Sequence, residues 1–400
     1  MGDVITMSPF DVSQRRHRVL AVVRHPVGGV RTHILYTYPL LLAAGYRFTF
    51  VVPNEDSNAQ FRSEVVEWPD SEVVAVPNGK RGGSPQFRPA VRRLLKQGRF
   101  SLIHSHGIGA AVPTWLANFG IHVPHVMTSQ DVFCHVNVEG IRGRLKLLAL
   151  ERLLRQLDVL IAVSNDTRDD HLRHLPRLRK GPCRIVVMPN GIDLNRYPLL
   201  DDEPASLRKK LGIGSETFLL GFLGRFMEQK GFLDLIEALE RIFSSAEVNR
   251  PVRLLAVGSG DCLVNYRKVL LRHPNAARNI AFMDHVPVAA PVLRELDLLV
   301  MPSLWEACPI LPMEAMCMGV PVLGTSCLGL REVLQGTPSV MVPPGDCDAL
   351  AGAIRRAIAS PWTESARRYA SKAQERFDVR RQAARLQQQF DELVSDVQHV

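Results

Sequence analysis

The sequence lacks any apolar stretch long enough to cross a membrane. Its longest apolar stretches, such as residues 34–44, are far shorter than the roughly 20 residues that a transmembrane helix needs. Residues 1–18 have no apolar core of the kind that defines a secretion signal. The chain has no internal repeat and no low-complexity tract, and its 400 residues suffice for two domains. We therefore expect a two-domain globular protein in the cytoplasm.

Paired cysteine motifs are also absent. The seven cysteines are odd in number, lie scattered along the chain and form no C-x-x-C. Such usage is typical of a cytosolic protein whose thiols stay reduced and pack as small hydrophobic side chains.

The excess of positive over negative charge lies entirely in the first half. Residues 1–200 hold 26 Lys and Arg against 16 Asp and Glu, a net charge of +10, whereas residues 201–400 hold 23 against 24, a net charge of −1. Two basic segments, 81–99 and 141–157, stand out, and the second interleaves its charges with leucines. Such a segment fits an anionic membrane surface, and it also fits a solvated helix face. A nucleic-acid partner is not favoured, because no recognition motif is present.

Both halves alternate short apolar strands with helices. Strands are expected at residues 18–23, 48–53, 73–76, 101–104, 125–128, 159–164 and 184–188, and then at 218–224, 253–257, 280–282, 298–301 and 320–324. Continuous apolar strands separated by helices predict parallel sheets covered on both faces. The predicted fold class is α/β, with two doubly wound, Rossmann-like domains facing each other across a ligand cleft.

Domain boundaries follow from composition. The first domain is expected over residues 1–195, an interdomain linker over the polar stretch 196–214, and the second domain over 215–375. The C-terminal helix, about residues 363–400, is longer than the second sheet needs. Its last part, 376–400, is therefore expected to cross back onto the first domain.

A glycine-rich turn follows the first strand of the second half. Gly224 and Gly231 let the backbone approach a ligand closely, and Arg225 and Lys230 can converge on an anion at the start of the next helix. The turn is not a P-loop, because G-x-x-x-x-G-K-[ST] is absent. Taken alone, it also reads as a surface turn with solvated charges. A second glycine turn, residues 257–261, is weaker evidence.

Two glutamates flank a helix start later in the chain. Glu306 and Glu314 have no cationic partner within residues 304–325, and Pro312 between them suits a first helical turn. Free N–H groups near residues 310–313 would suit a phosphate. Carboxylates would repel that phosphate, so the glutamates should address neutral hydroxyl groups. A nucleotide sugar has this pattern of hydroxyls and diphosphate, although the spacing also fits two surface charges.

The pair resembles a known signature. Glu306-x7-Glu314, followed by Gly319 and Pro321, is similar to the E-x7-E signature of retaining glycosyltransferases of family GT4, which have the GT-B fold. Further similar segments follow in family order: PVGGV at residues 26–30 with His33, LIHSHG at 102–107, MPNGID at 188–193, GR and KG at 224–225 and 230–231, and VPPGD at 342–346.

The resemblance implies roles for individual residues. Arg225 and Lys230 would bind the donor diphosphate and stabilise the leaving group, Glu306 would contact donor-sugar hydroxyls, and Glu314 would hold the ribose. One histidine of the H-x-H pair, His106 rather than His104, would line the reaction centre. In isolation such a pair is more often structural. Other donor contacts would come from Gly28, Gly29 and Gly224, from His285 and Val286 beside the base, and from the backbone at Cys308, Pro309, Ile310 and Leu311.

Three positions depart from the family pattern. Gln130 stands where a histidine is frequent, residues 282–286 lack the glycine usual near the base, and Ala307-Cys308 follows Glu306 where Phe-Gly is common. Donor choice and acceptor geometry therefore stay open.

We expect neither a metal nor a cofactor. Asp346 and Asp348 form a D-x-D, the metal motif of the other large glycosyltransferase fold. They follow Pro-Pro-Gly and precede a helix, so a helix cap is the expected role. Arg225 and Lys230 would cover the phosphate charge instead.

The predicted activity is transfer of a sugar from a nucleotide diphosphate sugar to an acceptor hydroxyl with retained configuration, in cell-surface polysaccharide or glycolipid assembly. The expected acceptor is lipid-linked or a saccharide, reached through peripheral contact of the basic first domain with the cytoplasmic membrane face. Alternatives are a sugar phosphorylase, a nucleotide-sugar epimerase or a catalytically silent sugar-nucleotide-binding subunit. A dinucleotide-dependent oxidoreductase is not favoured, because neither half opens with a G-x-G-x-x-G turn.

Overall fold

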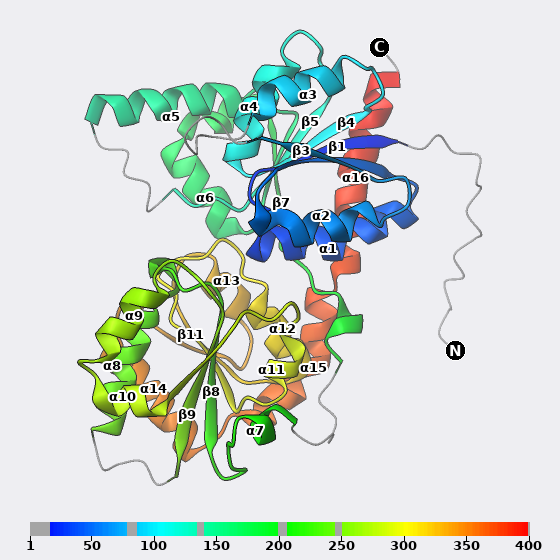
Figure 1. The fold of residues 1–400 in the computed structure, drawn as a ribbon. Helices are drawn as coiled ribbons and strands as arrows, with labels where there is room; N and C mark the ends of the chain where they lie inside the picture. The colour runs from blue at the N-terminus through cyan, green and yellow to red at the C-terminus, as the bar shows by residue number, and fades with distance from the viewer. Residues whose placement is uncertain (1–16, 78–85, 134–139, 199–205, 245–249, 399–400) are drawn as a thin grey trace.

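The first half of the chain folds around a parallel sheet. The computed structural model describes residues 17–77, 86–133, 140–198, 206–244 and 250–398 (Figure 1). The sheet has seven strands in the order β3-β2-β1-β4-β5-β6-β7. They are β1 (Arg18–Val23), β2 (Arg47–Pro53), β3 (Glu72–Val76), β4 (Leu102–His106), β5 (His125–Ser129), β6 (Val159–Ala162) and β7 (Arg184–Val187).

Helices cover both faces of this sheet. They include α1 (Gly28–Ala43), α2 (Ala59–Val66), α3 (Phe87–Leu95), α4 (Ile108–Asn118), α5 (Gly140–Leu154) and α6 (Asn165–His174). Along β1, Val19, Ala21 and Val23 pack with the α1 side, whereas Leu20 and Val22 pack with the α3 side. This alternation explains why the strand is apolar throughout, as expected for a parallel sheet buried on both faces.

The second half repeats the plan. Its six-stranded sheet has the order β10-β9-β8-β11-β12-β13. The strands are β8 (Phe218–Leu223), β9 (Val252–Val257), β10 (Ile280–Met283), β11 (Leu298–Met301), β12 (Val322–Thr325) and β13 (Val340–Val342). The helices are α7 (Ser206–Lys210), α8 (Phe232–Phe243), α9 (Leu263–Leu270), α10 (Pro274–Asn279), α11 (Ala290–Leu293), α12 (Leu311–Met318), α13 (Leu330–Leu334), α14 (Cys347–Ala359) and α15 (Thr363–Phe377). Strand β13 was not predicted, because its three residues are too few to show a pattern.

The predicted C-terminal helix is two helices. Helix α15 ends at Phe377, and α16 (Val379–Gln398) begins after Asp378. At the break, the N–H of Ile192 donates to Phe377 O (2.7 Å) and the N–H of Val379 donates to Ile192 O (3.0 Å). Bonds to the interdomain segment thus replace helical ones, so the prediction of a continuous helix was wrong.

Helix α16 packs on the first sheet rather than the second. Leu386, Phe390 and Leu393 belong to the same core cluster as Tyr38 and Phe48. Figure 1 shows α16 beside α1 and β4, whereas α15 packs against α12 of the second domain. The chain therefore crosses between the sheets twice. None of the helices that the structure describes combines the length and apolar character needed to cross a bilayer.

A buried carboxylate joins the two halves. Tyr36 of α1 donates its hydroxyl to Glu314 Oε1 of α12 (3.0 Å), and the hydroxyls of Tyr36 and Tyr197 are 3.0 Å apart. Glu314 is only 5% exposed. Burial raises the pKa of Glu314 to about 7, although hydrogen bonds from Tyr197 and Tyr36 favour its charged form.

This raised pKa predicts a pH dependence of stability. The folded protein binds the Glu314 proton more tightly than the unfolded chain, so this stabilisation is full below about pH 4.5 and is lost as pH rises through about 7. Relative to Glu314→Gln, the free energy of unfolding of the wild type should fall by about 3 kcal/mol across that window. Urea denaturation at several pH values measures it. The exposed Glu67→Gln should show no such trend, and a pH-independent difference for Glu314→Gln would contradict the assignment.

Candidate active site

Parallel pairing aligns the strand ends that carry the predicted donor residues. Leu223 of β8 pairs with Val257 of β9, and Val257 in turn pairs with Met283 of β10. The loops after these three strands therefore leave the sheet at one edge. This edge holds Gly224 and Arg225, the second glycine turn, and the segment with His285 and Val286.

The second glycine turn supports the loop that carries Arg225. The N–H of Gly224 donates to Val257 O (3.0 Å), and the N–H of Phe226 donates to Ser259 O (2.9 Å). Phe226 is fully buried, while Arg225 beside it is exposed. The second glycine turn was weak evidence in the sequence. In the structure it supports the loop that carries Arg225, which is predicted to bind phosphate.

The charge of Arg225 acts on a histidine of the first domain. Burial lowers the pKa of His25, which follows β1, and the positive charges of Arg24 and Arg225 lower it further. Glu55 and Asp131 act in the opposite direction. Arg225 therefore lies within electrostatic reach of the first domain, where a negatively charged ligand between the domains would meet it.

Lys230 is placed by a tight turn. Gly231 has φ +64°, and a Cβ there would lie 1.9 Å from Pro302 O. Only glycine allows this approach, which brings the end of the 3-10 helix Glu228–Lys230 against the loop after β11. Lys230 Nζ lies 2.7 Å from Glu306 Oε1, so Glu306 does have a cationic partner, 76 residues away in sequence.

Glu306 is held from a second side as well. Ser303 Oγ donates to Glu306 Oε1 (2.8 Å), and the Glu306 N–H donates to Leu328 O (3.0 Å). Glu306 as a whole is 5% exposed. A buried carboxylate needs such partners, because an unpaired charge away from water is costly.

The loop after Glu306 is hydrogen-bonded to the first domain. Ala307 O accepts from Ser164 Oγ (2.7 Å) and Thr167 Oγ1 (3.2 Å), and Cys308 O accepts from Asn190 Nδ2 (2.8 Å). Three of the four predicted backbone contacts have buried side chains, Cys308, Pro309 and Ile310, while Leu311 is half-buried. Contact with a donor there would therefore use the main chain.

Helix α12 begins at Leu311 with Pro312 in its first turn, which confirms the predicted helix start. Glu314 follows in that turn and contacts the tyrosines Tyr36 and Tyr197 described above. Sequence reasoning did not single out either tyrosine. Nothing in the local pattern marks them, because they come from α1 and from the interdomain segment.

The H-x-H histidines lie in a buried cluster. Both belong to β4, which extends two residues beyond the predicted strand end at residue 104, so their side chains share one face of the sheet. Tyr38 Oη lies 2.7 Å from His104 Nδ1 and 2.8 Å from His106 Nε2. One hydroxyl has one proton, so one of these rings donates to it. Burial lowers the pKa of both imidazoles well below the usual range, and they are therefore neutral.

The two histidines differ in the nitrogen that remains. His104 Nε2 is bonded to Thr128 Oγ1 (2.8 Å). His106 Nδ1 is buried and finds no hydrogen-bond partner among the described residues, and the same holds for His33 Nε2. The rings of His33 and His106 are 5.7 Å apart. His106 is thus the member of the pair with an unused ring nitrogen, and its place at the reaction centre stays a prediction.

The N-terminal glycine loop opens α1. Gly28 and Gly29 are exposed, and a Cβ at Gly29 would lie 3.4 Å from Gln130 Oε1. Gln130, which stands where the family often has histidine, therefore borders this loop. Neighbouring Asp131 accepts from the N–H of Ile108 (2.8 Å) at the start of α4.

The segment predicted beside the base follows β10. His285 is exposed, and Val286 is half-buried against the second-domain core. The N–H of Gly258 donates to Met283 O (2.9 Å), so the segment adjoins the second glycine turn. The D-x-D near the chain end is a helix cap, as predicted: Asp346 accepts from the N–H of Ala349 (2.9 Å), and Asp348 pairs with Arg241.

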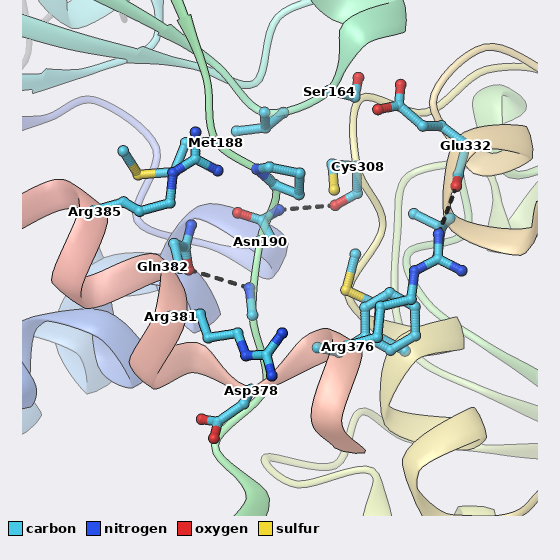
Figure 2. A pocket seen from close by; sticks show the side chains of 16 residues that line it. Ser164, Met188, Asn190, Cys308, Glu332, Arg376, Asp378, Arg381, Gln382 and Arg385 are labelled. Atoms are coloured by element: carbon cyan, nitrogen blue, oxygen red, sulfur yellow. Dashed lines mark hydrogen bonds between the residues drawn. The ribbon is translucent and has the colours of Figure 1, made fainter. Parts of the chain in front are cut away.

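A cavity of about 300 Å³ lies at the junction of the two crossings (Figure 2). Figure 2 shows Arg376, Arg381 and Arg385 around it. Of the predicted site residues only Cys308 lines it, so it is not the predicted donor site. Arg376 donates to Gln335 O within the second domain (3.0 Å), and Arg385 of α16 donates to Val187 O of β7 in the first (2.8 Å). The two arginines therefore hold α15 and α16 in place on either side of the crossing.

Comparison with known proteins identifies the family. A model described as Glycosyltransferase Family 4 matches residues 27–196, and one described as Glycosyl transferases group 1 matches residues 217–360. The structure is similar to sucrose-phosphate synthase from Thermosynechococcus elongatus, with a TM-score of 0.77 and 20% identity, covering 95% of this chain and 100% of the other. HepE of Anabaena in complex with UDP and glucose also gives a TM-score of 0.77 at 20% identity, covering 94% and 100%.

Curated relatives agree with this assignment. D-inositol 3-phosphate glycosyltransferase of Geodermatophilus obscurus is 28% identical over 289 residues, which is 68% of this chain but only 63% of the relative. UDP-Gal:alpha-D-GlcNAc-diphosphoundecaprenol alpha-1,3-galactosyltransferase of Escherichia coli is 23% identical over 66% of this chain and 68% of the relative. With both family models matched and the fold shared over nearly its whole length, the chain belongs to the group 1 glycosyltransferases of family GT4 and has the GT-B fold.

Proposed function

We propose that the chain is a retaining, metal-independent enzyme that moves a sugar from a nucleoside diphosphate sugar to an acceptor hydroxyl. The observation that carries this proposal is the contact between Lys230 and Glu306 at the edge where β8 and β11 end. A cation for phosphate and a carboxylate for hydroxyls stand side by side there, as the join between diphosphate and sugar requires. The second domain, residues 215–375, would hold the donor, and the first, residues 1–195, the acceptor.

The leaving diphosphate would be stabilised by positive charge. Arg225 is exposed on its supported loop, and Lys230 has three N–H donors, of which Glu306 occupies one. The remaining donors can meet phosphate oxygens as negative charge develops on them. Glu314 would bind the ribose, and His285 and Val286 would lie beside the base.

Retention would proceed without a protein nucleophile. Glu306 is the carboxylate nearest the proposed sugar, and Lys230 and Ser303 already hold its Oε1. Such pairing suits a hydroxyl acceptor more than an attacking group. The bond from the anomeric carbon to the leaving phosphate would break as the acceptor oxygen bonds on the same face, and the phosphate would take the acceptor's proton. His106 would line this centre as a neutral imidazole.

Other activities are less well supported. The two curated relatives described above are named as a glycosyltransferase and a galactosyltransferase, so the phosphorylase, epimerase and silent-subunit alternatives are not favoured. The Escherichia coli relative is named for a diphosphoundecaprenol acceptor. That name favours a lipid-linked acceptor here, in polysaccharide or glycolipid assembly.

Helix α5 would present the protein to a membrane. Ile141, Leu145 and Leu148 are 79%, 59% and 44% exposed, and their spacing puts them on one face of the helix. Arg142 and Arg144 flank them. An apolar stripe edged with positive charge suits an anionic lipid surface. We propose that α5 lies on the cytoplasmic face of the membrane.

The other basic segment, residues 81–99, is less suited to that role. Residues 81–85 lie outside the described residues. Arg92 donates to Ala117 O (2.9 Å) and Phe119 O (3.0 Å), and Arg99 is paired with Glu72. These charges fasten the first domain together, so the membrane proposal rests on α5.

Replacement of Lys230 tests the donor site. Lys230→Ala should lower kcat/KM by about 100-fold or more, because one charged contact to the leaving group is lost. Initial rates with UDP-, GDP- and ADP-sugars measure the effect. Lys268→Ala, an exposed lysine on α9, is the matched control and should leave the rate unchanged. Unaltered turnover in Lys230→Ala would refute the diphosphate role, and failure of every donor to bind the wild type would refute the proposed function.

Chelation tests the metal requirement. Arg225 and Lys230 provide the positive charge at the leaving group, so turnover in excess EDTA should stay within about twofold of turnover with Mg²⁺. Loss of turnover that Mn²⁺ or Mg²⁺ restores would show that a divalent ion takes part.

Vesicle binding tests the α5 surface. The wild type should sediment with phosphatidylglycerol vesicles at low salt and not with phosphatidylcholine vesicles, because charge contributes to the attraction. Ile141→Glu with Leu145→Glu should reduce the bound fraction several-fold. Val264→Glu changes an equally exposed apolar residue on α9 (65% exposed) and should bind like the wild type. Equal binding by all three proteins would contradict the role of α5.

A further inference from the structure

Helix α6 of the first domain and α13 of the second meet at their N-terminal ends. Glu332 of α13 accepts from the N–H of Asn165 at Oε1 (3.0 Å) and from the N–H of Asp166 at Oε2 (3.0 Å). These are first-turn amides of α6, which lack partners within their own helix. A carboxylate from the other domain therefore caps α6.

The capping is reciprocal, because a carboxylate of α6 in turn binds the start of α13. Asp166 of α6 accepts from the N–H of Gly329, just before α13, at Oδ2 (2.9 Å), and from Arg331 at both carboxylate oxygens (Nη2 to Oδ1, 2.6 Å). Burial alone would raise the pKa of Asp166, but the bonds from Arg331 and Gly329 outweigh it and hold that pKa below its usual value. Each domain thus supplies the carboxylate that the other needs.

The same two helix ends contact the loop backbone at Glu306 and Ala307. Gly329 has φ +76°, and a Cβ there would lie 2.3 Å from Glu306 O and 2.5 Å from Ala307 O. From the other side, Ser164 at the start of α6 donates to Ala307 O (2.7 Å). The peptide that follows Glu306 is therefore enclosed between the two helix ends.

We propose that Asp166 and Glu332 are positioning residues for sugar transfer. Their reciprocal hydrogen bonds between α6 and α13 would fix the backbone around Glu306. This inference rests on the proposed function. Neither residue lies in the two segments where the chain crosses between the domains, so these reciprocal hydrogen bonds break whenever the domains separate at this point. The loop at Glu306 and Ala307 then loses its contact with Ser164 of α6, while Gly329 stays beside it in the second domain. The donor sugar is held in its reacting position when Asp166 and Glu332 both make their hydrogen bonds to the opposite helix end.

The two carboxylates and the amides that they accept from act as one unit. Loss of either carboxylate leaves amides at one helix end unpaired and removes half of the enclosure, so the other half no longer closes the interface. Contacts that share one interface are not additive. The double variant is therefore expected to resemble each single variant, whereas independent surface bonds would give additive losses.

Kinetics of Asp166→Asn, Glu332→Gln and the double variant test the proposal. Each should lower kcat about tenfold or more, the double no further than about twofold beyond the singles. Affinity for the nucleoside diphosphate alone should stay within about twofold, because its predicted ligands are elsewhere. The share of donor hydrolysed by water should rise. Asp169→Asn, on the same helix and paired with Arg168, is the matched control and should behave like the wild type.

A second readout does not depend on turnover. Hydrogen exchange of the segments around Asn165–Asp166 and Gly329 should be slow in the wild type and at least tenfold faster in both single variants, each of which exposes amides on the opposite domain as well as its own. Arg331→Met removes the ion pair but leaves the amide bonds, so its exchange should change less. Similar thermal midpoints would confirm that the variants are folded.

The outcomes separate the two proposals. Wild-type turnover together with unchanged kcat in the variants would overturn the positioning role alone. Additive losses would do the same, as would hydrogen exchange that becomes faster only at the amides whose acceptor was replaced. Absence of turnover in the wild type with every nucleotide sugar would overturn the proposed function and the positioning role with it.

Discussion

Parallel pairing is the constraint on which the rest of the structure depends. In each sheet all strands point the same way, so every loop that follows a strand leaves at one edge. Lys230 and Glu306 follow β8 and β11, which are neighbours in the sheet although 76 residues separate the two side chains. The buried Glu306 carboxylate is stable because the strand order brings Lys230 next to it. Contacts from the first domain to Ala307 and Cys308 then complete a loop whose geometry neither domain defines alone.

Much of the fold was predictable because its signals are local. Apolar strands between helices predicted both sheets, and Asp346 before a helix predicted a cap, which the bond to Ala349 confirms. The misses have equally physical causes. Strand β13 has three residues and is defined by its pairing with β12. The helix break at Asp378 has no proline or glycine to announce it, because bonds to Ile192 produce it.

The site divides in the same way. Motif spacing named Arg225, Lys230, Glu306 and Glu314, but not the groups that hold them. Tyr36 reaches Glu314 from 278 residues away, and Asn165 reaches Glu332 from 167 residues away. Such pairs carry no sequence periodicity, since each is set by how two domains meet. The glycine turn at residues 257–261 was visible but not interpretable until its bonds to Gly224 and Phe226 were known.

The return of α16 to the first sheet bears on how the chain folds during synthesis. The core around Tyr38 and Phe48 includes Leu386, Phe390 and Leu393, so the first domain cannot close its core until residues beyond the second domain have left the ribosome. The second sheet needs no such late segment. The domain made first is therefore the one completed last, and its exposed apolar face waits through the translation of more than 300 residues between β2 and α16.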